Sequence, residues 1–91
     1  MNETSALDNL NKFLEENANF NPTESFTLSE PTEHTINNEK IYHIYWTELD
    51  GRNARGGYSY YVMPDGAILM PREGSGQPET PESIYARWQG E

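Results

Sequence analysis

The 91-residue chain contains no cysteine, so neither a disulfide nor a thiolate metal site can stabilise it. No apolar run is long enough to cross a bilayer, and no basic segment followed by an apolar stretch opens the sequence as in a signal peptide. The length predicts a single domain over residues 1–91, and the lack of long apolar runs predicts no membrane insertion. We expect it in the cytoplasm, or secreted or in the cell envelope if the chain is a trimmed mature domain.

Basic residues are also scarce: six lysines and arginines stand against fifteen acids, giving a formal net charge of −9. The first fifty residues hold ten acids and two lysines, whereas the remainder holds five acids and four arginines. An acidic surface repels nucleic acid and anionic lipid and favours a partner protein with a basic surface. The alternative interpretation is that the charge only keeps a small domain soluble.

Residues 40–71 contain most of the aromatic and β-branched residues, in three runs at 41–49, 58–63 and 67–70. Alternation within these runs predicts a three-stranded antiparallel meander. Tyr42, Ile44 and Trp46 would share one face of the first strand. Both faces of that strand are rather apolar, so we expect it to be central and covered on both sides.

Two turns divide this meander. Pro64, Asp65 and Gly66 are typical of a tight hairpin between the second and third strands. Residues 50–57 are longer than a tight turn needs, and they carry Arg52 and Arg55. This stretch predicts a mobile loop at the end of the sheet, with contact to an anion or partner as the alternative.

Before the meander, residues 1–4 are expected to be frayed, and Ser5 to cap a helix over about residues 6–17 or 6–18. Phe26 and Leu28 alternate with polar residues, which predicts a short edge strand. Residues 30–40 are polar. They form either a loop or a second short strand joined to the meander by a turn at Asn37 and Asn38.

After the meander, residues 72–79 predict a flexible connection. Thr80 and Pro81 then suit the start of a short second helix. The predicted fold class is therefore α+β: an N-terminal helix and a short C-terminal helix packed on an antiparallel sheet of three to five strands. A flat edge strand near Phe26 or Met70 would also allow two copies to pair as a homodimer.

Groups for catalysis are few. His34 and His43 are the only histidines, and a metal site would need both to converge with Glu33 or Glu48, which the spacing does not require. No serine elbow and no P-loop ending is present. We therefore predict no enzyme, no cofactor and no metal. A small enzyme would need His43 in a pocket beside a carboxylate.

The motif Tyr-Tyr-Val-x-x-Asp-Gly-x-Ile, from Tyr60 to Ile68, follows a helix and a strand. Over about residues 5–70 this layout resembles small helix-plus-sheet modules of bacterial envelope proteins, including PepSY-type domains. The second helix departs from that pattern, and no activity is carried over. The resemblance implies an extracytoplasmic module of a Gram-positive bacterium as the alternative function.

The function that the composition favours is protein binding without catalysis, by a stoichiometric inhibitor such as an immunity protein or a phage anti-defence protein. Acidic residues would steer the partner, and aromatic residues on the sheet would hold it. The residues expected to contact the partner are aromatic, basic or acidic: Tyr42, Trp46, Tyr58, Tyr60, Tyr61, Arg52, Arg55, Glu30 and Glu33.

Overall fold

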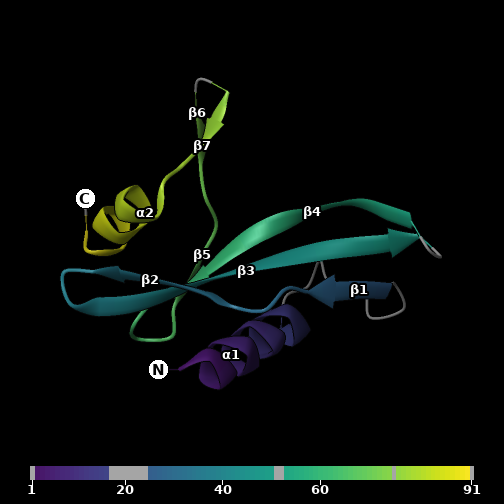
Figure 1. Cartoon of the computed structure of the whole chain (residues 1–91), viewed down its shortest axis with the longest axis horizontal. Coiled ribbons are helices and arrows are strands. Elements are labelled where there is room, and N and C mark those ends of the chain that lie inside the picture. The colour runs from purple at the N-terminus through teal and green to yellow at the C-terminus, as the bar shows by residue number, and fades with distance from the viewer. Residues whose placement is uncertain (1, 17–24, 51–52, 75, 91) are drawn as a thin grey trace.

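A computed structural model describes residues 2–16, 25–50, 53–74 and 76–90, and it confirms the α+β class (Figure 1). Helix α1 (Glu3–Glu16) comes first and helix α2 (Pro81–Trp88) last. The main antiparallel sheet has five strands: β1 (Ser25–Leu28), β2 (Thr32–Ile36), β3 (Glu39–Asp50), β4 (Asn53–Val62) and β5 (Ile68–Leu69). A separate hairpin contains β6 (Glu73–Gly74) and β7 (Gln77–Pro78).

Strand β3 is the centre of the sheet, as the apolar character of both its faces predicted. Strands β1 and β2 pair with different parts of the same edge of β3, and β4 pairs along the other edge. The short β5 pairs only with the end of β4, opposite Tyr61 and Val62. The β3–β4 hairpin is therefore much longer than its neighbours, and in Figure 1 it extends beyond both helices.

An extra residue separates β1 from β2. Three residues, 29–31, lie between the two strands, whereas the β3 residues that face Leu28 and Thr32 are separated by only two. This interruption is a β-bulge. Ser29 holds the junction on β3, because its backbone N–H donates to the carbonyl of Tyr45 and its Oγ accepts the N–H of Tyr45, both at 2.9 Å.

Because of the bulge, the apolar side chains of β1 and β2 point to opposite faces of the sheet. Side chains alternate between faces, so one extra residue reverses the alternation. As a result Phe26 and Leu28 of β1 pack against the core under α1, whereas Ile36 of β2 packs against the core under α2. One edge of the sheet thus contributes apolar side chains to both cores.

Each helix covers a different face of the sheet. The α1 core combines three residues of the helix with alternate residues of β3 and β4: Ala6, Leu10, Leu14, Tyr42, Ile44, Tyr60 and Val62. The α2 core uses the opposite parity: Ile41, Tyr61, Met63, Ile84 and Tyr85. The apolar stripe of α1 packs on the face that contains Tyr42, Ile44 and Trp46, which confirms the shared face predicted for these residues.

The two hairpin turns follow the predicted chemistry. Asn37 and Asn38 both have positive φ (51° and 65°), the geometry of a two-residue hairpin turn, so residues 30–40 contain a strand and not only a loop. In the second turn the N–H of Gly66 donates to the carbonyl of Met63 at 2.8 Å, and Asp65 Oδ1 accepts the N–H of Ala67 at 3.0 Å.

Helix α2 is fixed at its start. Thr80 Oγ1 accepts the N–H of Ser83 at 3.2 Å, which is the predicted cap. Arg87 reaches back with Nη2 2.8 Å from Glu79 Oε1 and 2.7 Å from the carbonyl of Met70. The bonds from Arg87 are the main cause that lowers the pKa of Glu79 to about 2.

Three local predictions were wrong. The N-terminal cap is Asn2, whose Oδ1 accepts the N–H of Ser5 at 2.8 Å, so α1 starts at Glu3 and residues 3–4 belong to it. The expected loop at 50–57 is mostly strand, because β4 begins at Asn53. Where a flexible connection was expected at 72–79, β6 and β7 pair antiparallel. The predicted helix end at 17–18 lies outside the described residues.

Candidate partner-binding surface

Three of the tyrosines predicted to contact a partner are core residues. Tyr42, Tyr60 and Tyr61 are only 2%, 8% and 6% exposed. Tyr42 and Tyr60 lie under α1, and Tyr61 lies under α2. Burial raises the pKa of each phenol, and for Tyr42 the carboxylate of Glu33 adds to the effect. Their inclusion in a contact surface is therefore corrected: they offer almost no area to a partner.

Accessible aromatic surface is found instead on the part of the sheet that extends past the helices. We call this part the projecting half and define it as β1, residues 45–50 of β3 and residues 53–59 of β4 (Figure 1). Tyr58 is 56% exposed and Tyr45 is 39% exposed, on opposite faces. Tyr45 was absent from the predicted contact residues, and the structure places it on the face away from α1.

On the α1 side, three aromatic residues cross the projecting half from β1 through β3 to β4. This aromatic row consists of Phe26, Trp46 and Tyr58. The rings of Phe26 and Trp46 stack with centroids 6.1 Å apart, and those of Trp46 and Tyr58 stack at 5.7 Å. Trp46 Nε1 is buried and has no hydrogen-bond partner among the described residues. Two predicted contact residues, Trp46 and Tyr58, are therefore brought together.

A carboxylate lies next to this row. Glu48 faces Phe26 on one side and Gly56 on the other, so it shares the α1 side of the sheet with Trp46 and Tyr58. Within the described part of the chain it forms no ion pair or hydrogen bond. Gly56 leaves room beside it, because a Cβ placed there would meet no atom within 4 Å. Residue Glu48 was considered only as a metal ligand from the sequence.

The predicted charged contact residues are not part of one cluster. Glu30 is exposed at the bulge, whereas Glu33 on β2 forms an ion pair with Lys40 at 3.3 Å and accepts a long hydrogen bond from Tyr42 at 3.5 Å. Arg52 lies outside the described residues. Arg55 is the additional residue of a second bulge, since Glu48 faces Gly56 and Leu49 faces Ala54. Its side chain is likewise outside the description.

The opposite face carries the two histidines. His43 stacks on Tyr61 with ring centroids 4.7 Å apart, and His34 lies against the same ring at 6.4 Å. Burial and then the neighbouring His34 lower the pKa of His43. Its Nε2 atom is buried, and within residues that the structure describes it has no hydrogen-bond partner. No set of three or more potential metal ligands was found among those residues.

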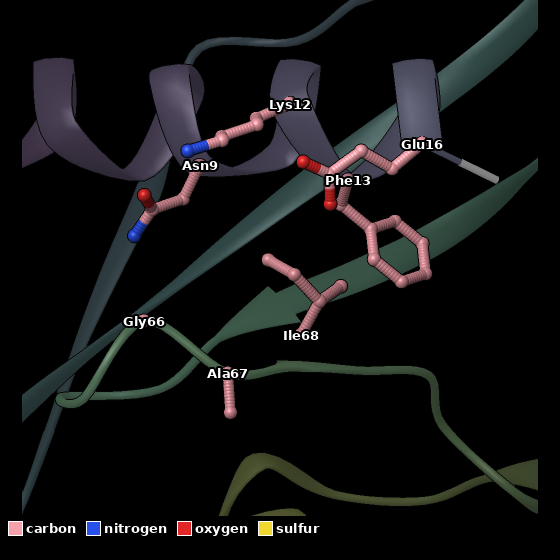
Figure 2. A pocket seen from close by; sticks show the side chains of 7 residues that line it. All are labelled: Asn9, Lys12, Phe13, Glu16, Gly66, Ala67 and Ile68. Atoms are coloured by element: carbon pink, nitrogen blue, oxygen red, sulfur yellow. The ribbon is translucent and has the colours of Figure 1, made fainter.

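A shallow groove of about 300 Å³ lies between α1 and the turn that joins β4 to β5. Figure 2 shows Phe13 and Ile68 pointing into it from opposite sides, with Lys12 and Glu16 along the helix. Its rim carries both signs of charge, so the groove selects no ligand by electrostatics. None of the residues that line this groove was among the predicted contact residues.

No family model, curated protein or solved structure matches this chain. None of the helices in the described ranges is both long and apolar enough to pass through a membrane.

Proposed function

We propose that this chain is a non-enzymatic, acidic protein-binding module that acts as a stoichiometric inhibitor, of the immunity or phage anti-defence type. The observation that supports this function best is the aromatic row, with Tyr58 56% exposed, in a chain with a net charge of −9. Exposed, stacked aromatic residues commonly anchor protein interfaces, because they bury large area at low entropy cost. Phe26 and Trp46 pack against the edge of the α1 core, and the exposed Tyr58 extends the row beyond it.

Two steps would produce binding. The negative charge of the chain increases the rate of encounter with a basic protein, an effect that weakens as salt screens the charges. Tyr58 and Trp46 then become buried against the partner and slow its dissociation. The partner is accordingly a protein with a basic surface, and no nucleic acid or cofactor is involved.

The experiment begins with capture of the partner from a host lysate and continues with purified proteins. Association and dissociation rates are measured by surface plasmon resonance for the wild type and Tyr58→Ala. The control is Gln77→Ala, because Gln77 is exposed on β7, outside the projecting half. We expect Tyr58→Ala to increase the dissociation rate about tenfold or more. Gln77→Ala should change neither rate.

The salt dependence tests the first step separately. The wild-type association rate should fall as ionic strength rises, with little change in the dissociation rate. An association rate independent of salt would refute electrostatic steering. Equal dissociation rates for the wild type and Tyr58→Ala would refute the aromatic row as the contact surface.

A further inference from the structure

We propose that the aromatic row and Glu48 form a binding site for an arginine side chain of the partner. This inference deepens the proposed function and rests on it. It assigns one chemical group, a guanidinium, to the region between Tyr58, Trp46 and Glu48. Three features of this region support the assignment: the ring geometry, a carboxylate without a partner among the described residues, and open space beside that carboxylate.

The rings provide a platform for a planar cation. One face of Tyr58 stacks on Trp46 at 5.7 Å and an interplanar angle of 28°, while the residue as a whole remains 56% exposed. An arginine guanidinium stacks on such a ring within about 6 Å of its centroid. Arginine is favoured over lysine here, since the guanidinium is planar and holds its hydration less tightly than an ammonium group.

Glu48 provides the counter-charge at a suitable spacing. It lies two residues from Trp46 on the same side of β3, which corresponds to about 7 Å along a strand. A guanidinium resting on the rings can therefore direct N–H groups at this carboxylate. The ion pair of Glu33 with Lys40 shows the contrast, because Glu33 already has a cation at 3.3 Å whereas Glu48 has none among the described residues.

Gly56 keeps the site open. It faces Glu48 across the β3–β4 pair, and a Cβ at this position would meet no atom within 4 Å. A long side chain approaching from solvent therefore has space next to the carboxylate. The adjacent Gly57 is different, because its Cβ would lie 1.9 Å from the carbonyl oxygen of Trp46. Both positions therefore favour glycine, Gly57 because of this contact and Gly56 because its φ is +117°, but only at Gly56 is the space beside the backbone open.

The test uses the full chain labelled with ¹⁵N and the peptide acetyl-Gly-Arg-Gly-Arg-Gly-amide as the probe, followed by NMR. The chain has two tryptophans, so the indole N–H of Trp88 on α2 serves as an internal reference for that of Trp46. We expect the arginine peptide to shift the Trp46 indole and the amides of Gly56 and Tyr58, and to leave Trp88 in place. The lysine counterpart of the peptide should bind more weakly, by about fivefold.

Two matched pairs of variants sharpen the result. Glu48→Gln and Glu15→Gln remove the same charge, but Glu15 is exposed on α1. We expect Glu48→Gln to weaken the peptide about fivefold and Glu15→Gln to weaken it less than about twofold. Likewise Tyr58→Ala should abolish the shift at Trp46, and Tyr45→Ala, on the opposite face, should preserve it. Equal effects within either pair, or equal binding of the two peptides, would overturn the proposal.

Failure of this inference can be distinguished from failure of the proposed function. If the arginine peptide shifts no signal while Tyr58→Ala still weakens the captured protein partner, the arginine site is wrong and the binding function stands. If the peptide behaves as expected while Tyr58→Ala leaves the partner complex unchanged, the arginine site is supported and the function assigned to it is wrong.

Discussion

The two ends of the sheet use the same alternating strands for different purposes. At the end covered by the helices, alternation sends Tyr42 and Ile44 under α1 and Ile41 under α2, and all three are at most 2% exposed. In the projecting half the same alternation leaves Tyr45 and Tyr58 accessible on opposite faces. The comparison shows that aromatic content in a strand does not by itself indicate a surface. An aromatic residue in these strands is buried or exposed according to whether a helix covers that part of the strand.

Truncation at one residue of each region should show the largest difference in stability. Ile44 is fully buried, so Ile44→Ala should lower the free energy of unfolding by about 2–5 kcal/mol. Tyr58→Ala loses only its stacking on Trp46 and should cost about 1 kcal/mol or less. Urea denaturation measures both. Comparable losses would mean that the projecting half is as important to the fold as the covered half.

Gly57 lies in the projecting half, but a substitution there should destabilise the fold more than Tyr58→Ala does. The new Cβ of Gly57→Ala would lie 1.9 Å from the carbonyl oxygen of Trp46, so the β3–β4 pair must move apart. We expect a loss of about 2–3 kcal/mol in the free energy of unfolding. The control is Ser59→Ala, two residues further on the same strand, which should stay within about 0.5 kcal/mol of the wild type. A neutral Gly57→Ala would show that this hairpin is readily deformed.

The contact between Glu79 and Arg87 tests how firmly α2 is held in the covered half. The pKa of Glu79 in the folded protein is lowered from 4.5 to about 2, so its ionised form stabilises the fold above pH 4.5. That contribution is lost as the pH falls through about 2.

Glu79→Gln should therefore cost about 1 kcal/mol at neutral pH, and its deficit relative to the wild type should shrink as the medium is acidified. Urea midpoints measured across this pH range provide the test. Glu82→Gln is the control, since Glu82 is exposed on the same helix. A deficit that persists unchanged into acid would exclude the ionised carboxylate as its source.

The smallest expected effect concerns His43, which lies where α2 coverage gives way to the open face. Its pKa is lowered from 6.5 by burial and then by His34, so the neutral form stabilises the fold above pH 6.5. That stability declines as the pH falls below 6.5 toward the folded pKa. An NMR titration of the imidazole should give a value below 6.5, and His34→Gln should raise it. A pKa above 6.5 would contradict the assigned environment.

Much of the fold followed from local chemistry in the sequence. Asparagine tolerates positive φ, which predicted the turn at Asn37 and Asn38. Thr80 before a proline predicted the start of α2. The position of Asn2 was missed because a second good cap residue, Ser5, lies three positions later. Strand β4 was predicted too short because residues 53–57 have little intrinsic strand preference, and their pairing with β3 imposes the strand.

The candidate surface was only partly predictable. Alternation predicted that Tyr42, Ile44 and Trp46 share a face of β3, but it contains no information on the register with β4 or on how far a helix reaches along that face. Tyr60 is therefore buried while Tyr58, two residues earlier, is not. Nothing in the sequence indicated that Glu48 lies beside the aromatic row. Phe26 and Gly56, which face it in the sheet, lie on other strands, more than twenty residues before it and eight residues after it.

The single extra residue between β1 and β2 constrains how the length of this chain can vary in evolution. Removing one residue there would turn β2 over, exposing Ile36 and directing the carboxylate of Glu33 toward the layer beneath α2. Removing or adding two residues there would leave the orientation of β2 as it is. Descendants that keep both helices should thus differ at this junction by even numbers of residues, a parity rule that can be checked by counting.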